Sequence, residues 1–523
     1  MAVIRKKIMG PPGTGKTHRL VHHYLNKELN ELHTEPQRIA YVTFSKAASL
    51  DGAKKIQTAE DDQGQLLFPG VELLYISTLH AVGKKELEIP KKQILTGAKW
   101  KQFKNVYPVY SDINFDSYVN EYGQTITKNK NLEVINFSRA KEISLEEACI
   151  QLKYHESTAV DIFRVKQLER DIEYYKGQTN MYEFSDMIKL FADDEEKNLA
   201  LDAIFLDEAQ DLNPLQWRMF FHIESQCKRS YIAGDDDQTI FKFQGADPNI
   251  FIDLEGERDD QEKSYRVPKA VHRQALKILP HITKRVKKKW YAKDEEGEFI
   301  DNCFLEEIDF SKGEWMVLAT TKKLLEDFAE HFYRKGLRIF GKNNSVLPNS
   351  VLEAYRFWTK LNKGELIATE DAKKIWEYLR YNKGHIKYGF SSGKTLIGDE
   401  MVSLNILKKD HGLLIEGDWQ QLSFEEDTKK YMKSILKKGD DLSTDSRIEL
   451  STIHGAKGRE RENIVLCMDY GTETQSEWLS REAYKDPDST HRLFFVGVTR
   501  AMQRLYILAP LTAHYYTIGE PIV

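Results

Sequence analysis

Two short segments, far apart in the chain, restrict its fold more than any other feature. Residues 10–17 read Gly-Pro-Pro-Gly-Thr-Gly-Lys-Thr and fit the pattern G-x-x-x-x-G-K-[ST]. Residues 203–211 read Ala-Ile-Phe-Leu-Asp-Glu-Ala-Gln-Asp, in which β-forming residues are followed by carboxylates. The second pattern is typical of a buried parallel strand with Asp207 and Glu208 at its C-terminal edge. The pair predicts an α/β fold built on a parallel sheet.

Together the two segments predict a site for ATP and Mg²⁺. The backbone of such a loop cradles phosphates, Lys16 adds a positive charge, and the Thr17 hydroxyl reaches Mg²⁺. Asp207 is then the carboxylate that holds Mg²⁺, and Glu208 is placed to orient and deprotonate the attacking water. The alternative is an ordinary strand-to-helix turn and, separately, an acid-rich helix N-terminus. The loop residues expected to bind nucleotide are Gly10, Pro11, Pro12, Gly13, Thr14, Gly15, Lys16 and Thr17.

The residues around the loop favour the nucleotide site over a chance match. An apolar start at Val3, Ile4 and Ile8 precedes the loop, and an apolar series with helical spacing follows it at Leu20, Val21, Tyr24, Leu25 and Leu29. Residues 38–44 then read as a second buried strand. Strand, loop, helix and strand in this order form a βαβ unit.

Composition limits the class of protein. A chain of 523 residues is too long for one core, and 41% hydrophobic with 30% charged residues is typical of a globular protein. Four widely separated cysteines indicate neither a disulfide framework nor a zinc site and fit a reducing cytoplasm. No apolar run approaches membrane-spanning length, so no membrane association is expected. A net charge of −5 means that any contact with nucleic acid must be local.

Several side chains at predicted strand ends are candidates for contact with a nucleic acid. Phe44 ends the strand of residues 38–44, and Thr78 and His80 follow a strand-like piece over residues 71–76. Phe241 and Phe243 stand two apart, which in an extended segment would put both rings on one side, available to stack on bases. The alternative for each of these residues is packing or helix capping.

Gln238 lies in the polar loop that follows the strand of residues 231–233. Because an amide both donates and accepts hydrogen bonds, Gln238 can touch a γ-phosphate and the attacking water in turn. Such a residue can sense hydrolysis.

Two basic stretches have less specific patterns. Residues 99–104 (Lys-Trp-Lys-Gln-Phe-Lys) interleave basic and aromatic side chains, and the alternative is a solvated helix face with two buried rings. Residues 284–289 (Lys-Arg-Val-Lys-Lys-Lys) could follow phosphates, but such a run is usually a solvated face.

Eight segments in a fixed order carry a resemblance to a known family. They are residues 10–17, 43–48, 77–80, 207–211, 234–241, 264–266, 451–460 and 498–501. This series resembles the motifs of the UvrD/Rep/PcrA group of superfamily 1 DNA helicases. The resemblance covers residues 1–84, 178–340 and 446–510.

The resemblance assigns roles by matched position. It implies that Tyr265 stacks on adenine, that Arg266 and Arg500 contact the γ-phosphate, and that Glu460 meets the ribose. It further implies that His454 and Lys457 couple nucleotide to DNA, and that Phe44, Phe243, Thr78 and His80 contact DNA. His18 stands where members of the family commonly carry an arginine and is counted among the ATP-binding residues.

The resemblance also implies two RecA-like P-loop motor domains with parallel sheets, each interrupted by a mainly helical insert. The first domain would comprise residues 1–84 and 178–262, with the insert at 85–177; its sheet is expected to resume at residues 182–188. The second would comprise residues 263–341 and 446–523, with the insert at 342–445. The pattern predicts strands at 314–319, 337–340, 448–451, 464–468 and 505–508 and a helix at 322–334.

The activity that follows is that of an ATP-dependent DNA helicase, which translocates on single-stranded DNA and unwinds duplexes, with 3′ to 5′ polarity. Two alternatives stay open: a translocase that strips proteins without unwinding, and an ATP-gated switch that binds nucleic acid. The expected partners are single-stranded DNA, junctions of single-stranded and duplex DNA, and replication or repair proteins. RNA remains open as the nucleic acid.

Overall fold

The computed structural model describes residues 3–115, 129–154, 160–341, 347–390, 392–398, 400–472 and 486–522, and the backbone of residues 118–119 and 125–126. The chain divides into two compact units. The first comprises Met1–Gly297, Ala483–Thr499 and Ile518–Val523, and the second comprises Glu298–Glu482 and Arg500–Thr517. Residues 263–297 therefore pack with the first unit, while the division into six ranges remains a prediction.

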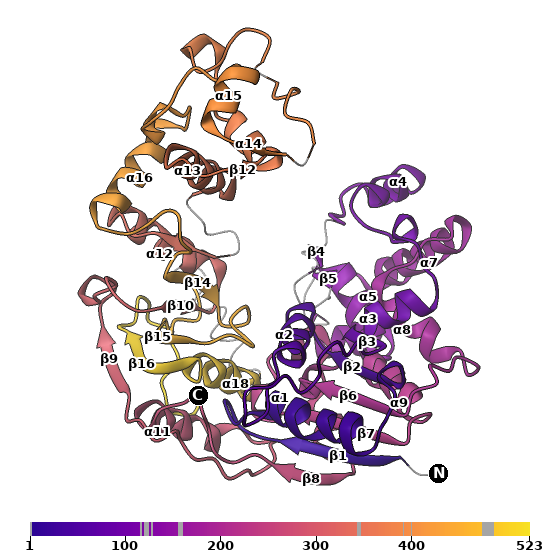
Figure 1. Ribbon diagram of the computed structural model, residues 1–523. Helices are drawn as coiled ribbons and strands as arrows, with labels where there is room; N and C mark the ends of the chain where they lie inside the picture. Colours follow the sequence, from indigo (N-terminus) through magenta and orange to yellow (C-terminus); the bar gives the residue numbers. More distant parts are fainter. Residues whose placement is uncertain are drawn as a thin grey trace. The chain divides into compact units, whose positions relative to one another are not determined.

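The first unit is built on a six-stranded sheet in which all the strands are parallel (Figure 1). The strand order is β3-β2-β6-β7-β1-β8. Every residue of β2 and β6 is buried, as the continuous apolar patterns predict. The strands are β1 (Ile4–Met9), β2 (Ile39–Thr43), β3 (Tyr75–Thr78), β6 (Ala203–Asp207), β7 (Arg229–Gly234) and β8 (Glu257–Asp260).

The pairing register brings the carboxyl ends of these strands together. Thr43 lies opposite Thr78 on one side and Asp207 on the other, and Met9 lies opposite Gly234. The predicted loop, the two carboxylates and the segment of Gln238 therefore leave the sheet at the same edge, where open α/β sheets bind ligands.

Helices pack against this sheet. Leu20, Val21 and Leu25 of the helix that follows the P-loop are buried with Tyr41 and Phe205, so the predicted apolar series is confirmed. The helices are α1 (Lys16–His18), η1 (Arg19–Leu25), η2 (Lys27–Glu31), η3 (Pro36–Arg38), α2 (Lys46–Gln57), α3 (Leu79–Glu86), α8 (Phe184–Asp193), η6 (Ala209–Asp211), α9 (Pro214–Glu224), η7 (Asp236–Gln238), η8 (Lys242–Gln244), α10 (Pro248–Asp253), α11 (Lys269–Ile278), η9 (Leu279–His281) and α18 (Pro487–Val498).

The prediction of a strand at residues 182–188 is wrong. This stretch begins α8, because Glu183 and Asp186 form a capping box and Met187, Ile188 and Phe191 supply a buried helical stripe. The strand predicted at residues 71–76 is observed four residues later in its start, as β3 over Tyr75–Thr78.

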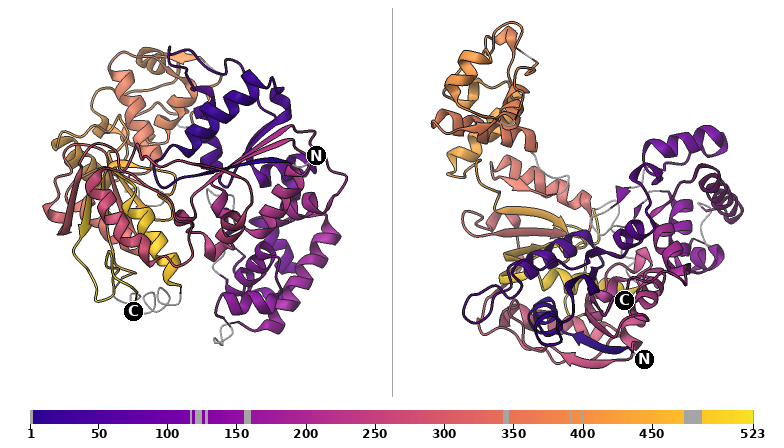
Figure 2. Two further views of the ribbon diagram at one scale, coloured as in Figure 1. Left: turned by 90° about the horizontal axis from the view of Figure 1, so that it is seen from below. Right: turned by 45° about the vertical axis from the view of Figure 1, so that its right-hand side comes forward.

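The first insert folds as a mainly helical body with its own core, drawn in purple and magenta in Figures 1 and 2. Ser144 and Glu147 form a capping box at the start of α6. Trp100 and Phe103 are buried in the core, which agrees with the solvated-face interpretation of residues 99–104. Its elements are η4 (Lys91–Gln93), α4 (Ala98–Val106), η5 (Pro108–Tyr110), β4 (Tyr118–Val119), β5 (Thr125–Ile126), α5 (Lys130–Lys141), α6 (Leu145–Gln151) and α7 (Ile162–Thr179).

The second unit has another parallel sheet of six strands, in the order β11-β14-β10-β15-β16-β9. The predicted helix at 322–334 is α12 (Lys322–Arg334), and each predicted strand overlaps an observed one. The strands are β9 (Glu298–Cys303), β10 (Trp315–Ala319), β11 (Ile339–Phe340), β14 (Ile448–Thr452), β15 (Arg461–Leu466) and β16 (Ala501–Leu508); η10 (Leu305–Glu307) precedes β10.

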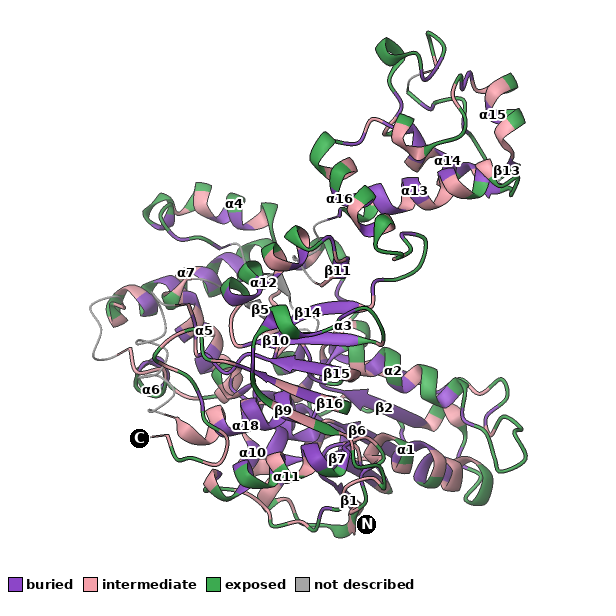
Figure 3. Cartoon of the chain, turned by 90° about the vertical axis from the view of Figure 1, so that its left-hand side faces the viewer, coloured by how far each residue is buried: buried purple, intermediate pink, exposed green. Residues whose placement is uncertain are grey.

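The second insert also has a core of its own, in which Trp358 and Trp376 are buried. In Figure 3 the strands of the two sheets are mostly buried, whereas the helices of both inserts alternate between buried and exposed residues. The elements of the second insert are α13 (Asn349–Asn362), β12 (Ile367–Ala368), α14 (Thr369–Trp376), η11 (Tyr381–Lys383), β13 (Met401–Val402), α15 (Leu404–Asp410), η12 (Trp419–Gln421) and α16 (Glu426–Lys437).

The predicted fold class is confirmed: the protein is a mixed α/β chain with two parallel six-stranded sheets, as two RecA-like domains require. Among the described helices, none combines the length and the apolar character needed to cross a membrane.

Candidate functional site

The predicted phosphate loop connects β1 to α1. Gly13 and Gly15 have φ angles of 75° and 81°, a left-handed backbone that glycine adopts without strain. Lys16 Nζ donates to the carbonyl oxygens of Gly10 and Pro11 at 2.7 and 3.3 Å, so the ammonium group lies within the curve of the loop. Desolvation lowers the pKa of Lys16, whereas the nearby carboxylates oppose that shift. A bound phosphate would replace these carbonyl contacts with opposite charge.

Thr17 and Asp207, 190 residues apart in sequence, are in direct contact. The Thr17 hydroxyl donates to Asp207 Oδ2 at 2.7 Å, and the Glu208 N–H donates to Asp207 Oδ1 at 2.9 Å. Burial and the Glu208 carboxylate raise the pKa of Asp207, while the Thr17 hydrogen bond opposes the rise. A hydroxyl beside a carboxylate is the kind of oxygen donor set that Mg²⁺ binds in company with phosphates and water, so the residues fit this ion.

Glu208 has a left-handed backbone, with φ 56° and ψ 40°, although it is not a glycine. Such a conformation costs about 1–2 kcal/mol and is concentrated at functional sites. The Glu208 side chain accepts a hydrogen bond from Gln210 Nε2 at 2.6 Å. Gln210 Oε1 in turn accepts from the Asp235 N–H at 2.9 Å. The amide of Gln210 therefore joins the carboxylate segment to the segment that carries Gln238.

Gln238 ends the 3₁₀ turn η7 and donates from Nε2 to Asp235 Oδ2 at 2.7 Å. Asp235 accepts this bond at the same time as it interacts with Lys288. Gln238 is 7% exposed, so its amide is held by a buried carboxylate at the edge of the sheet. The predicted position of Gln238 in a polar loop after the strand agrees with this geometry.

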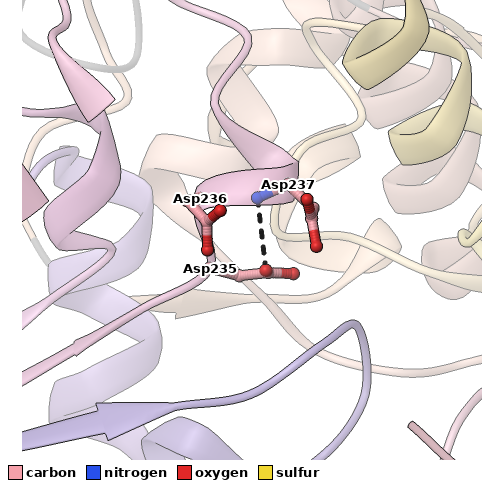
Figure 4. A group of neighbouring side chains, drawn as sticks. All are labelled: Asp235, Asp236 and Asp237. Atoms are coloured by element: carbon pink, nitrogen blue, oxygen red, sulfur yellow. Dashed lines mark hydrogen bonds between the residues drawn. The ribbon is translucent and has the colours of Figure 1, made fainter. Parts of the chain in front are cut away.

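Asp235, Asp236 and Asp237 form an acidic cluster in this turn (Figure 4), in which the Asp237 N–H donates to Asp235 Oδ1 at 3.3 Å. The cluster is matched by cations from the basic run at 284–289. Lys288 Nζ contacts all three carboxylates, and Arg285 binds Asp237 through two nitrogens at 2.6 Å each. The cluster is therefore part of a salt-bridge network.

The solvated-face interpretation is wrong for two members of this run. The side chain of Lys288 is only 3% exposed and that of Arg285 is 16% exposed, because both turn inward to the aspartates. Burial alone would lower the pKa of Lys288, but Asp235, Asp237 and Asp236 raise it overall, so the amine stays charged. This run fixes the segment that carries Gln238 and does not form a free basic track over its whole length.

Residues 264–266 pack on the P-loop within the first unit. The Ser264 hydroxyl donates to the Pro12 carbonyl at 2.9 Å, and the Tyr265 N–H donates to the Gly13 carbonyl at 2.8 Å. A Cβ on Gly13 would lie 2.5 Å from Arg266 Cβ, so only glycine allows this approach. Tyr265 is 74% exposed, which leaves its ring free of the core beside the loop. Arg266 is thus anchored next to the predicted phosphate site.

His18 is exposed, and its ring stacks on His22 with centroids 3.8 Å apart. Partial burial and the neighbouring His22 lower the pKa of His18, so the imidazole is neutral near pH 7. The side chain at this position is therefore an uncharged ring, in contrast to the arginine that the resemblance leads one to expect.

The predicted nucleic-acid contacts of the first unit fall into two groups. Phe44 and Phe241 are 3% and 1% exposed, with ring centroids 5.3 Å apart, whereas Phe243 is 48% exposed. The expected extended geometry of Phe241 and Phe243 is wrong: residues 242–244 form the 3₁₀ turn η8, which sends the first ring into the core and the second to the surface.

Thr78 and His80 lie at the start of α3. The Thr78 hydroxyl accepts from the Ala81 N–H at 3.4 Å and so caps the helix, the alternative given for it above. Desolvation lowers the pKa of His80 to about 4, so this imidazole is neutral at pH 7. Any contact of His80 with a phosphate would have to be an uncharged hydrogen bond.

The remaining predicted residues belong to the second unit. His454 and Lys457 lie in the turn after β14, where the Lys457 N–H donates to the His454 carbonyl at 3.3 Å. The Arg461 N–H, next to Glu460, donates to the Arg500 carbonyl at 3.3 Å. Arg500 is 1% exposed. The structure therefore brings Glu460 and Arg500 together, each directly before one of the neighbouring strands β15 and β16.

Two family descriptions match this chain. The family description "UvrD/REP helicase N-terminal domain" matches residues 5–259, and "UvrD-like helicase C-terminal domain" matches residues 418–511. The chain belongs to the UvrD/Rep/PcrA-like superfamily 1 helicases. Between them, the two matches include the P-loop, Asp207, Glu208, Gln238 and Arg500, whereas residues 264–266 lie between the two matched ranges.

Individual relatives of this helicase family are distant. ATP-dependent DNA helicase PcrA of Bacillus subtilis (strain 168) is 22% identical over 403 residues, which cover 71% of this chain and 50% of that protein. ATP-dependent DNA helicase Rep of Buchnera aphidicola subsp. Acyrthosiphon pisum (strain APS) is 21% identical over 398 residues, covering 71% and 58%. The chain thus spans about half the length of the curated relatives it matches.

A solved structure, "The structure of PRRSV helicase", covers 97% of this chain and 52% of its own with 10% identity and a TM-score of 0.33. A likeness of that size carries no argument about the fold.

Three residues of this helicase-family site were not singled out from the sequence. Gln210 stands inside the acidic segment, but its side chain gave no sign of linking Glu208 to Asp235. Tyr41 is a buried aromatic in β2, and Lys288 belonged to a run of like charges. All three contact residues that are distant in sequence or in another loop, so only the fold reveals their partners.

Proposed function

We propose that the protein is an ATP-dependent DNA helicase that translocates on single-stranded DNA in the 3′ to 5′ direction and unwinds duplexes. The observation that carries the proposal is the contact of Thr17 with Asp207, beside a strained Glu208 and the lysine of the loop. This arrangement joins a phosphate cradle, a metal-binding pair and a base for water. DNA as the nucleic acid is inferred from the family to which the chain belongs.

The chemistry proposed for the first unit follows from the donors and acceptors of its residues. Lys16 contacts the transferred phosphate, and Glu208 orients the attacking water and accepts its proton. Thr17 and Asp207 would hold Mg²⁺, which when bound would supply positive charge to the phosphate oxygens. Gln238 senses whether the γ-phosphate is present, because its amide can exchange Asp235 for a phosphate oxygen.

Two arginines would stabilise the charge that develops on the transferred phosphoryl group. Arg266 is anchored against the P-loop by the backbone contacts of residues 264 and 265. Arg500 is contributed by the second unit, with Glu460 beside it for the ribose. Tyr265 stacks on adenine, a role that its exposed ring favours, and the uncharged His18 lies on the same side of the loop: a Cβ on Gly15 would lie 3.8 Å from both residues.

Contact with single-stranded DNA is proposed for both units. Phe243 offers an exposed ring for a base, and Phe44 and Phe241 support it from the core. Thr78 and His80 would meet the DNA backbone, and His454 and Lys457 would connect nucleotide to DNA. Junctions of single-stranded and duplex DNA, and proteins of replication or repair, are the proposed partners, in the cytoplasm.

ATP turnover with and without single-stranded DNA tests the proposal. Native protein is expected to hydrolyse ATP faster with DNA, and Glu208→Gln to lose about 10²- to 10⁴-fold in turnover while it still binds nucleotide. Glu196→Gln, at an exposed position of the loop before β6, is the matched control and should leave turnover unchanged. Turnover that is indifferent to DNA would instead support an ATP-gated switch.

Unwinding of tailed duplexes separates the remaining candidates. The protein is expected to separate a duplex with a 3′ single-stranded tail in the presence of ATP. It is not expected to separate a duplex with a 5′ tail. A protein that displaces a bound roadblock from single-stranded DNA but separates neither duplex would be the translocase without unwinding. Unwinding of only the 5′-tailed substrate would refute the polarity.

A further inference from the structure

The structure places a buried phenol against the carboxylate that is proposed to hold Mg²⁺. We infer that Tyr41 is a positioning residue that fixes the orientation of Asp207 for the metal. This inference rests on the proposed ATP site and adds to it a residue on β2, a strand to which no part of the predicted Mg²⁺ site was assigned.

Tyr41 reaches Asp207 across neighbouring parallel strands. Its own register partner on β6 is Phe205, two residues before the carboxylate, so the long side chain extends toward the carboxyl edge of the sheet. The Tyr41 hydroxyl donates to Asp207 Oδ2 at 3.1 Å. Tyr41 is fully buried, and its ring lies among the apolar side chains of the first core. The phenol therefore has little freedom to leave the carboxylate.

The same carboxylate is held from three directions. Oδ2 accepts from Tyr41 and from the Thr17 hydroxyl, and Oδ1 accepts from the Glu208 N–H. If the Thr17 oxygen turns to a cation, Tyr41 remains as the side chain that donates to Asp207. A carboxylate held in this way loses less rotational freedom when it binds a metal, because its orientation is already set.

Helix α2 leaves space for this ring. A Cβ on Gly52 would lie 2.9 Å from Tyr41 Cε1, closer than real side chains approach. Gly52 lies in the middle of α2, where glycine is unfavourable relative to alanine by about 1 kcal/mol. Glycine is needed at position 52 because α2 approaches the Tyr41 ring too closely for a Cβ.

A second buried phenol in the same sheet provides a control. Tyr231 of β7 donates to Glu28 Oε1 at 2.6 Å, and both residues are nearly inaccessible, at 3% and 0% exposed. Glu28 is paired with Arg229 and has no part in the proposed site. Removal of either hydroxyl deletes a hydrogen bond to a buried carboxylate, but only Tyr41 contacts the metal-binding group.

The experiment measures the Mg²⁺ concentration for half-maximal binding of a fluorescent, non-hydrolysable ATP analogue to the full chain. Tyr41→Phe is expected to raise that concentration about 10-fold or more, the range found when groups that orient metal ligands are removed. Tyr231→Phe is expected to stay within about twofold of native protein. An unchanged Mg²⁺ requirement in Tyr41→Phe would overturn the inference, and so would an equal rise in both variants.

Two further measurements keep the result interpretable. Binding of the analogue without Mg²⁺ should be equal in native protein and Tyr41→Phe, which shows that the loop is folded. If Tyr41→Phe does not fold, Gly52→Ala displaces the ring and keeps the hydroxyl, and it should also raise the Mg²⁺ requirement; no rise would overturn the inference. If native protein binds the analogue in a Mg²⁺-dependent way but shows no DNA-stimulated turnover, the proposed function is refuted. The role of Tyr41 in orienting Asp207 is not affected by that result.

Discussion

Lys288 shows how one residue changes meaning between sequence and fold. In the sequence it is one of several cations in a row, a pattern usually found on a solvated face. In the structure its amine lies among Asp235, Asp236 and Asp237, the turn that leads to Gln238. Three carboxylates so close together repel one another, and a buried cation removes that repulsion. The position of Gln238 therefore depends on a charge contributed from 50 residues further along the chain.

Replacement of Lys288 by methionine is expected to destabilise the first unit by about 3–5 kcal/mol, because it leaves buried carboxylates without their cation. Chemical denaturation of native and variant protein, followed by the fluorescence of buried tryptophans, measures the change. Lys289→Met is the matched control: its side chain is 72% exposed, and the effect should stay within about 0.5 kcal/mol. Equal effects of the two substitutions would contradict the assigned network.

At the scale of elements, α2 lies close against β2. Glycine in a helix interior normally weakens the helix, because it adds freedom to the unfolded chain and buries no side chain. Gly52 is an exception because the Tyr41 ring occupies the space that a Cβ would need. Gly177 of α7, in contrast, would place a Cβ where no atom lies within 4 Å.

The same substitution is therefore expected to have opposite signs at these two glycines. Gly177→Ala should stabilise the protein by about 0.5–1 kcal/mol. Gly52→Ala should destabilise it by about 1–3 kcal/mol, the usual cost of overpacking. Denaturation midpoints of the two variants against native protein give the result. A gain in stability for Gly52→Ala would contradict the close packing of α2 against the Tyr41 ring.

At the scale of the whole molecule, the proposed activity needs both compact units. The first holds the P-loop, Asp207, Glu208, Gln238 and Arg266, and the second holds Glu460 and Arg500. Nucleotide binding is expected to depend mainly on the first unit. Hydrolysis is expected to require both, since an arginine finger acts on charge that appears only in the transition state.

Arg500→Ala is accordingly expected to lower DNA-stimulated ATP turnover by about 10³-fold while the affinity for a non-hydrolysable analogue changes little. Arg504→Ala is the control, on the strand β16 that follows Arg500. Arg504 is a partly exposed residue that pairs with Glu298, and its loss should leave turnover intact. Steady-state turnover and equilibrium binding separate the two effects. A parallel loss of affinity for the analogue in Arg500→Ala would show that Arg500 also contacts the nucleotide before the transition state.

The sequence by itself determined the parts of this protein whose patterns are local. Continuous apolar runs specified β2, β6 and β10, the glycine-rich motif specified the loop, and apolar spacing specified α12, because burial on a strand or helix leaves its period in the chain. The eight motifs in order determined the family in the same way.

Only the tertiary structure decided which distant groups meet. The ring of Phe241 went to the core and that of Phe243 to the surface because the segment turns, and residues 182–188 became a helix because two carboxylates cap it. Tyr41 donates a hydrogen bond to Asp207, 166 residues away in sequence, and Lys288 donates one to Asp235, 53 residues away. The first contact depends on the strand order and register of a parallel sheet, and the second depends on the path of the loop that carries Lys288; neither leaves a period in the sequence.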